Sequence, residues 1–301
     1  GSNAFPMRWF GFGFNAFGQI NGEKLAEGVT SPTELTSHAD GRHARTGCKV
    51  HFLLLSGPTL NLPLVPGGYI GAKPPFYRSL SPHLKAKSLA LSAEHAVLLG
   101  ASGAVYTWGL GRHGQLGHGG LTSEEEPRAV EALGGMPMSY VATGSWHSVC
   151  ISDGGDLYVW GWNESGQLGL PSRGLRKALQ QQGNPHAADI CLEGGMQIKS
   201  PQDGKCEEVF ISIQAFPALL DVSPSCELMA VSCGSRHTAA VTTTGDLYTW
   251  GWGEYGQLGH QSLMSTDEPQ CVEFFREQKM RVIDVVCGPW NTFAAVKEEV
   301  A

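Results

Sequence analysis

A chain of 301 residues can bury a substantial core, as one large domain or as two ordinary ones. Its 40 glycines and eight tryptophans, among only 16% charged residues, are typical of all-β proteins with tight turns and aromatic packing, and they argue against a helical protein. A formal net charge of −7 argues against a protein that grips nucleic-acid phosphates, and it favours a basic protein partner such as a histone tail.

Signals for metals, cofactors and membranes are missing from the sequence. The eight cysteines contain no C-x-x-C pair and no zinc-type spacing, so we expect no metal and no cofactor. The N-terminus does not resemble a signal peptide and no apolar run is long enough to span a membrane, which predicts an intracellular protein that does not bind membranes. Residues 1–4 (GSNA) resemble an expression-tag remnant, and residues 5–301 are predicted to form a single domain.

The first predicted strand lies near the N-terminus. The sequence FGFNAFGQ at 12–19 matches WGWNESGQ at 160–167, which is the second half of a longer repeat. Further along the chain, His43 stands 13 residues before Ser56, the spacing found in the complete repeats. We therefore predict a degenerate repeat over residues 36–60.

The segment at residues 73–78 reads KPPFYR and combines extended, aromatic and basic character. Such a segment could dock on a partner, or it could pack as a linker against the rim of the domain. Its candidate partner-binding residues are Lys73, Pro75, Phe76, Tyr77 and Arg78.

Three complete repeats follow, starting at residues 92, 143 and 233, and they align without gaps. In each repeat a histidine (His95, His147, His237) precedes a tryptophan (Trp108, Trp160, Trp250) by 13 residues. A β-rich run, a glycine-containing turn and a second β-rich run lie between these two markers, which is the signal of a β-hairpin. Each repeat is therefore one supersecondary unit.

The glycines after two of the marker tryptophans also fit a nucleotide-binding motif. Residues 109–114 and 251–256 both match G-x-G-x-x-G. A dinucleotide-binding motif must open a helix, but the sequence that follows is polar or contains proline. The alternative of a nucleotide-dependent enzyme thus requires a helix after Gly256, and we favour turns instead.

The second and third complete repeats are separated by an insertion. The two tryptophans Trp160 and Trp250 are 90 residues apart, whereas Trp108 and Trp160 are 52 apart, so about 38 residues are extra. The extra sequence is polar and rich in glycine and proline, and it predicts a long insertion loop over 171–213 within the single domain.

The last repeat is incomplete. It starts at Cys287 with CGPWNTFAAV, with Asn291 in the histidine place, and the sequence ends before a Trp-Gly strand. The missing half is the one found at residues 12–19. We therefore predict an all-β fold, a closed β-propeller of four-stranded antiparallel blades in which N- and C-terminal strands pair in one sheet. The spacing supports five blades.

The motifs CGSRHT, LYTWGWG and YGQLGH resemble the repeat of the regulator-of-chromosome-condensation family. Members of that family are β-propellers that typically have seven blades, so the number of blades stays open between five and seven. The segments WFGFGF (9–14), PFYR (75–78), GWNESGQL (161–168) and CGPWNT (287–292) are similar to short vertebrate members of the family that pair with a JmjC-type, iron- and 2-oxoglutarate-dependent oxygenase.

This resemblance implies a non-enzymatic adaptor. It would be nuclear and chromosome-associated, would hold the JmjC oxygenase (a histone demethylase or hydroxylase) near chromatin, and would support histone methylation control and chromosome segregation. Histones are a further possible partner, and we expect a monomer without direct sequence-specific nucleic-acid binding. The alternative is guanine-nucleotide exchange on a small nuclear GTPase, the activity of the family's founding member, against which the acidic balance argues.

The repeated residues are expected to be structural. Histidines that recur once in each blade are spread around the ring and cannot bind one metal ion together. We expect each ring to form a hydrogen bond with a backbone group of its own blade. The marker tryptophans are expected to pack between neighbouring blades, and Cys233 and Cys287 to be small buried residues in strands. The sequence shows no Ser-His-Asp or Cys-His arrangement and no paired carboxylates, so we predict no catalytic residues.

Function is expected where the repeat is broken. The residue before each marker histidine or asparagine varies, and these residues are predicted to share one face of the ring, where exposed tryptophan and arginine are the usual interface anchors. The candidates are Glu94, Trp146, Arg236 and Trp290. A second set varies after the Trp-Gly strand and comprises Arg112 and His113, Asn163 and Glu164, and Glu254 and Tyr255.

Overall fold

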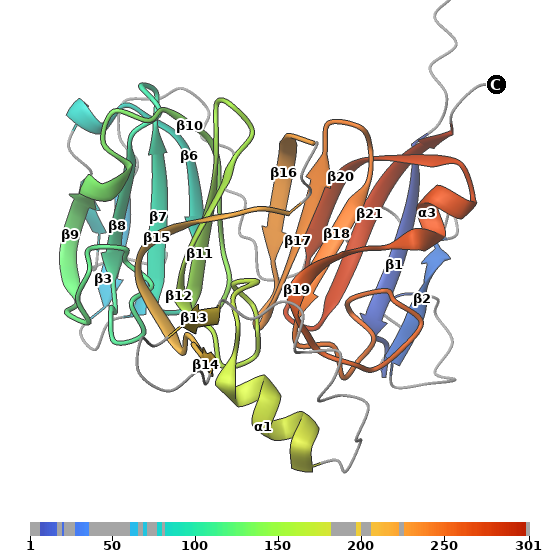
Figure 1. Ribbon diagram of the computed structural model, residues 1–301. Coiled ribbons are helices and arrows are strands. Elements are labelled where there is room, and N and C mark those ends of the chain that lie inside the picture. Colours follow the sequence, from blue (N-terminus) through green and yellow to red (C-terminus); the bar gives the residue numbers. More distant parts are fainter. Residues whose placement is uncertain are drawn as a thin grey trace, which may run out of the picture.

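The computed structural model describes residues 7–16, 20, 28–35, 61–65, 69–70, 77–79, 82–181, 197–199, 206–222 and 226–298. In this part of the chain, four antiparallel sheets of four strands each form successive blades (Figure 1). The predicted all-β propeller is confirmed.

The first and third blades are each built from four consecutive strands, and in the second blade the insertion separates the third strand from the fourth. The first blade has the order β6 (Ala86–Leu91), β7 (His95–Gly100), β8 (Val105–Gly109) and β9 (Glu124–Ala129). The second blade comprises β10 (Met138–Thr143), β11 (His147–Ser152), β12 (Leu157–Trp162) and β15 (Ile213–Leu220). The third blade comprises β16 (Leu228–Cys233), β17 (His237–Thr242), β18 (Leu247–Gly251) and β19 (Thr266–Cys271).

The fourth sheet, here called the closing blade, joins the two ends of the chain. Its order is β2 (Gly28–Glu34), β1 (Arg8–Phe14), β21 (Asn291–Glu298) and β20 (Met280–Cys287). The strands β1 and β21 pair from Arg8 opposite Val296 to Gly13 opposite Asn291, and blue and red strands lie side by side in Figure 1. The predicted pairing of N- and C-terminal strands is confirmed.

Smaller elements lie outside these blades. A three-stranded sheet has the order β4 (Tyr69–Ile70), β3 (Asn61–Val65) and β5 (Tyr77–Ser79). Short helices are η1 (Pro82–Leu84), η2 (Glu131–Leu133) and α3 (Glu273–Glu277). The degenerate repeat predicted over 36–60 lies outside the described residues.

The insertion contains regular structure where the sequence predicted a loop. Helix α1 (Arg173–Gln181) opens it, and the short strands β13 (Gln197–Lys199) and β14 (Cys206–Glu208) pair within it. The helix begins where the Ser172 hydroxyl accepts a hydrogen bond from the Leu175 amide at 3.2 Å, an N-cap contact, and Leu175 itself is buried. The polar, glycine-rich neighbourhood hides this local signal.

The core consists of aromatic and aliphatic side chains between the blades. Trp160 packs with Val97 and Leu99 of the first blade, and Trp250 packs with Val149 and Leu157 of the second. This confirms the predicted role between blades for Trp160 and Trp250, whereas Trp108 packs with Ala96 and Leu98 of its own blade. Cys233 and Cys287 are likewise buried strand residues, as predicted.

The glycine that follows each marker aromatic residue is required by the backbone. These glycines have φ between 105° and 112°, a region that side chains disfavour. A Cβ atom on Gly161 would lie 2.5 Å from the carbonyl oxygen of Trp146. The chain therefore brings the end of one hairpin strand against the residue that precedes the marker histidine. The glycines are Gly13, Gly109, Gly161 and Gly251.

The nucleotide-binding alternative is wrong. After Gly251 the chain forms turns and then enters strand β19, and residues 252–265 contain no helix. Among the described residues no group of His, Cys, Asp and Glu is arranged to hold a metal. No helix in the described ranges is long and apolar enough to cross a bilayer.

Candidate functional site

The candidate residues meet at one end of the blades, here called the marker face. It is where the strands β7, β11, β17 and β21 begin and where β8, β12, β18 and β1 end. In each blade the carbonyl oxygen before the marker histidine or asparagine accepts a hydrogen bond of 2.8–2.9 Å from the amide that follows the marker glycine. The pairs are Glu94 with Leu110, Trp146 with Trp162, Arg236 with Trp252 and Trp290 with Phe14.

This bond places two variable side chains next to one another in every blade. The sequence identified the first member of each pair, because it precedes the histidine, but it missed Trp162 and Trp252. A signal for them is present in the sequence: the residue directly after the marker glycine differs from repeat to repeat. These residues are Leu110, Trp162, Trp252 and Phe14. The side chains at both positions of all four pairs are half-buried.

The first group of side chains on this face is the arginine–tryptophan cluster, made of His113, Trp146, Trp162 and Arg236. The rings of Trp146 and Trp162 meet edge to face with centroids 5.2 Å apart. The Arg236 guanidinium lies 5.7 Å from the Trp146 centroid and 5.2 Å from that of Trp162, and His113 approaches both rings at 6.0 and 5.7 Å. Three consecutive blades thus contribute to one cluster.

The second group is the aromatic corner, made of Trp252, Tyr255 and Trp290 at the junction of the third blade with the closing blade. The ring centroid of Trp252 lies 5.0 Å from that of Tyr255 and 5.1 Å from that of Trp290. Tyr255 and Trp290 are 6.0 Å apart, and all three pairs are edge to face. Phe14 extends the corner, with its ring centroid 4.9 Å from that of Tyr255.

An ion pair continues the face onto the first blade. Arg112 Nη2 lies 2.9 Å from Glu94 Oε1, with 62% of the arginine side chain and 15% of the glutamate side chain exposed. Burial, and then the charge of Arg112, lower the pKa of His113, while Glu94 acts in the opposite sense. The His113 ring is therefore neutral at pH 7, and the exposed Arg112 guanidinium is the positive charge next to it.

Several buried polar atoms of the marker face have no hydrogen-bond partner among the described residues. They are Glu94 Oε2, His113 Nδ1, Trp146 Nε1 and Arg236 Nε. Buried polar atoms are nearly always bonded to protein or to water. Their gathering on one face indicates capacity for hydrogen bonds to an incoming group.

Below the marker face, the repeated histidines form a belt across the blade junctions. Their Nε2 atoms lie 2.8–2.9 Å from serine or threonine hydroxyl oxygens of the next blade. Each hydroxyl in turn donates a hydrogen bond of 2.7–2.8 Å to the backbone carbonyl oxygen of a glutamine. The three chains are His95–Ser148–Gln115, His147–Thr238–Gln167 and His237–Thr292–Gln257. The prediction of a backbone partner within the same blade is wrong.

This geometry determines the protonation state of the belt. Because each hydroxyl gives its proton to a carbonyl, the histidine Nε2 must be the donor to it. Burial lowers the pKa of His95, His147 and His237 to about 3, so all three rings are neutral. The marker tryptophans bond the same carbonyls, Trp160 Nε1 to Gln115 at 2.8 Å and Trp250 Nε1 to Gln167 at 3.1 Å.

The remaining candidates lie elsewhere or serve the scaffold. Lys73, Pro75 and Phe76 lie outside the described residues, and Tyr77 and Arg78 belong to strand β5 of the small three-stranded sheet. Asn163 is fully buried and donates hydrogen bonds to the carbonyls of Leu170 and Ile211 at 2.8 and 2.9 Å. Its role is to hold the start and end of the insertion together.

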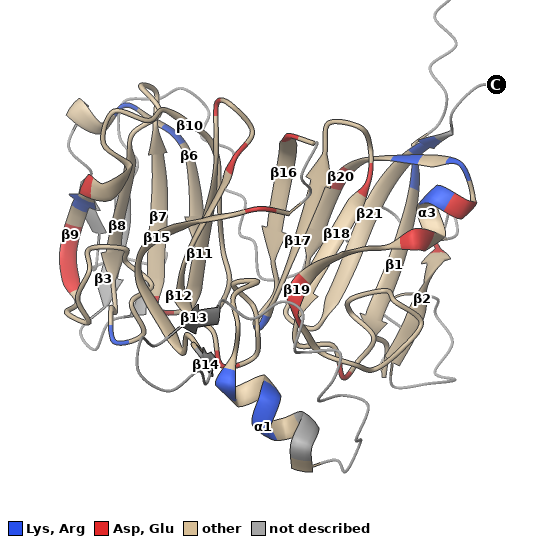
Figure 2. Cartoon of the chain, in the orientation of Figure 1, with Lys and Arg blue, Asp and Glu red and all other residues tan. Residues whose placement is uncertain are grey.

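Charge is unevenly distributed over the chain. Lys and Arg gather on α1, with the sequence RGLRKALQQ, and Asp and Glu on β9, with the sequence EEEPRA (Figure 2).

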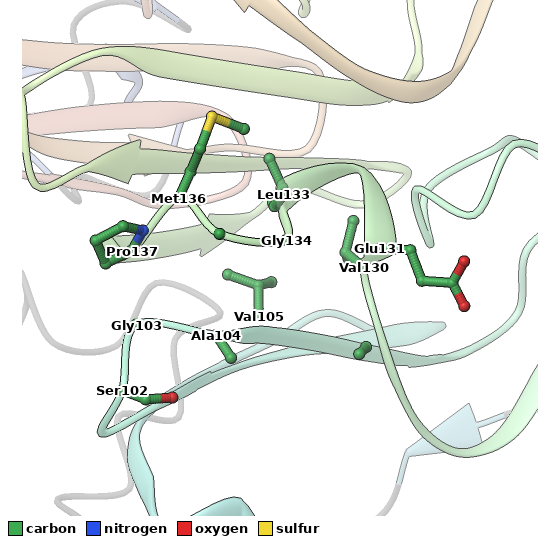
Figure 3. Close-up of a pocket in the computed structure, with 12 residues that line it drawn as sticks. Ser102, Gly103, Ala104, Val105, Val130, Glu131, Leu133, Gly134, Met136 and Pro137 are labelled. Carbon is green, nitrogen blue, oxygen red and sulfur yellow. The ribbon is translucent and has the colours of Figure 1, made fainter.

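A cavity of about 590 Å³ lies at the other end of the first blade (Figure 3). It is lined by the turn at 102–105 and by residues between 129 and 137, and Glu131 is the one ionisable residue of this lining. In Figure 3 the Glu131 carboxylate points away from Val105 and Leu133. The cavity is apolar, and its lining shares no residue with the marker face.

The blades and their hydrogen-bonded junctions define a β-propeller with an aromatic face that carries Arg112 and Arg236. The Regulator of chromosome condensation (RCC1) repeat matches residues 102–151, 154–241 and 244–295, and the chain belongs to this family. It is 52% identical to the human RCC1 domain-containing protein 1 over 243 residues, which cover 79% of this chain and 64% of that relative. The chain thus spans somewhat less than two thirds of the length of this curated relative.

Two solved structures share the fold. The Saccharomyces cerevisiae protein Prp20p is 23% identical, with a TM-score of 0.54 over 72% of this chain and 44% of that one. Yeast RCC1 (Prp20) bound to Kap60 is 19% identical, with a TM-score of 0.56 over 92% of this chain and 58% of that one. The sequence resemblance to the family is confirmed.

Proposed function

We propose that this chain is a non-catalytic adaptor that binds a JmjC-type 2-oxoglutarate oxygenase and links it to chromatin in the nucleus. The observation that carries the proposal is the aromatic marker face, on which Trp146, Trp162 and Arg236 join the second blade to the third, and Trp252 and Trp290 join the third blade to the closing blade. Tryptophan and arginine are the residues that most often dominate binding energy at protein interfaces.

Relatives support a role in binding proteins. The human relative at 52% identity is named for its RCC1 domain, and the yeast protein Prp20p has binding properties towards Gsp1p and histones. A net charge of −7 suits association with basic chromatin proteins, because complementary charge raises the rate of encounter.

The test is a pull-down of the purified oxygenase by the full chain and by single variants. We expect Trp146→Ala and Trp290→Ala each to weaken binding about 10-fold or more, as truncated hot spots do. Met136→Ala is the matched control, because Met136 lines the cavity at the other end of the first blade. Full binding by both tryptophan variants would exclude the marker face, and no binding by the parent chain would exclude this partner.

A second candidate function is guanine-nucleotide exchange on a small nuclear GTPase. The binding of Prp20p to Gsp1p favours it, although the likeness at 23% identity concerns the fold. The release of a fluorescent GDP from the GTPase measures this activity directly. Release that is not accelerated by a stoichiometric amount of this chain would reject it.

A further inference from the structure

The two groups on the marker face are built from equivalent positions of the repeat. His113 and Tyr255 occupy the same place after the Trp-Gly strand, and Trp146 and Trp290 the same place before the marker histidine or asparagine. In both groups the ring from one blade leans on the ring that opens the next blade, with centroids 6.0 Å apart in each case. The blade junction therefore creates the same surface corner twice.

The two corners differ in what lies over their rings. In the arginine–tryptophan cluster, Arg236 places its guanidinium 5.2–5.7 Å from two indole centroids, within the range of favourable cation–π contact. In the aromatic corner no described lysine or arginine lies over Trp252, Tyr255 or Trp290. The rings there are half-buried, so each still presents some surface to solvent.

The charge around the aromatic corner favours a cation. Glu254, the residue before Tyr255, is exposed, and the whole chain is acidic. The backbone of Arg236 bonds that of Trp252, but its guanidinium is directed to the other cluster. The aromatic corner thus offers an edge-to-face pair of indole rings with centroids 5.1 Å apart, like the pair at 5.2 Å over which Arg236 lies, and the acidic Glu254 is next to Tyr255 in the sequence.

We propose that the aromatic corner receives an arginine or lysine side chain from an extended basic segment of a protein partner. The inference rests on the proposed function as a protein-binding adaptor and specifies the chemistry that the partner must bring. In this arrangement the incoming cation lies over the Trp290 ring, as Arg236 lies over the equivalent Trp146 ring. Trp252, from the preceding blade, supplies the second indole ring, which Trp162 supplies in the other cluster.

The test uses the full chain and a fluorescein-labelled peptide of alternating arginine and glycine, with binding followed by fluorescence anisotropy. The matched ligand has citrulline at every arginine, which keeps the shape and removes the charge. We expect the arginine peptide to bind about 3- to 30-fold more tightly than the citrulline peptide, the range of a cation–π contact. Equal affinity of the two peptides would overturn the proposal.

Variants locate the site. Trp290→Leu and Trp252→Leu should remove the preference for arginine, and Tyr255→Phe, which keeps the ring, should retain it. Met136→Leu, in the cavity at the other end of the first blade, is the control and should leave the preference unchanged. Preference for arginine retained in both Trp290→Leu and Trp252→Leu would overturn the proposal.

Circular dichroism and the melting temperature of each variant separate lost binding from lost folding. Glu254→Gln, at an exposed position, should fold normally and reduce the preference for arginine by a smaller factor.

Removal of the internal cation gives an independent readout. Arg236→Ala exposes the rings of Trp146 and Trp162, and the stoichiometry of arginine peptide should rise from one to two for each chain. An unchanged stoichiometry would contradict the equivalence of the two corners. If the oxygenase fails to bind but the arginine peptide binds at the corner, the proposed partner is wrong and the cation site stands. The opposite outcome rejects the cation site alone.

Discussion

Trp146 and His147 are neighbours in the chain and belong to two different regions of the molecule. His147 belongs to the belt, where it is fully buried and bonds Thr238 of the next blade, as His95 and His237 bond their own hydroxyl partners. Trp146 belongs to the marker face, where the equivalent residues of other blades are a glutamate, an arginine and another tryptophan. Positions that the scaffold demands are repeated, and positions that vary are available for recognition.

The largest expected effect is a difference in stability between variants of two tryptophans that are two residues apart in the chain. Trp250 is completely buried and donates to Gln167, whereas Trp252 is half-buried on the marker face. We expect Trp250→Ala to lower the free energy of unfolding by about 3–5 kcal/mol and Trp252→Ala by about 1 kcal/mol, the ordinary effect of a point mutation. Urea denaturation measures both. Similar losses for the two variants would remove the distinction between belt and face.

A smaller effect tests the hydrogen-bonded belt itself. Thr238→Val keeps the shape of the side chain but leaves His147 Nε2 and the Gln167 carbonyl without this hydroxyl, so we expect a loss of about 1–3 kcal/mol in the free energy of unfolding. Thr243→Val, at an exposed position, is the matched control and should change stability little. Equal stability of both variants would show that the hydroxyl bridge contributes nothing.

The difference between the two regions also explains what could be predicted from the sequence. The hairpins, the glycine turns and the closing of the two termini follow from local patterns and from their spacing. The partner of His147 could not be predicted, because Thr238 is 91 residues away and only the ring arrangement brings it near. Helix α1 was missed because its cap, Ser172, stands in polar, glycine-rich sequence, and the pairing of Trp146 with Trp162 depends on a backbone bond between strands.

The pH dependence of stability should come from the belt. Burial lowers the pKa of His237 from 6.5 to about 3, so the unfolded chain binds this proton more readily. The stabilisation is complete above pH 6.5 and is lost as the pH falls towards 3, with a slope of about 1.4 kcal/mol per pH unit for each such histidine. His237→Asn imitates the closing blade, where Asn291 has the histidine place.

We expect His237→Asn to reduce the slope of stability against pH below pH 6.5 by the contribution of one histidine, about 1.4 kcal/mol per pH unit. Melting temperatures measured from pH 7.5 to pH 4 give this slope for the parent and the variant. Thr243→Val, at an exposed position and without an ionisable group, is the control and should leave the slope unchanged. A variant slope equal to that of the parent would mean that His237 does not titrate on unfolding.

The smallest expected effect concerns the ion pair of the marker face. Arg112→Gln removes the charge of a side chain that is 62% exposed, opposite a Glu94 side chain that is 15% exposed. Because solvent reaches the guanidinium, the pair contributes about 1 kcal/mol or less. We therefore expect nearly unchanged urea denaturation, but a changed dependence of partner association on salt, because an exposed charge at the rim acts on the rate of encounter. Stopped-flow association at low and high salt measures it. A large loss of stability in this variant would place the Glu94–Arg112 pair with the belt, since scaffold positions, unlike those of the marker face, do not tolerate the change.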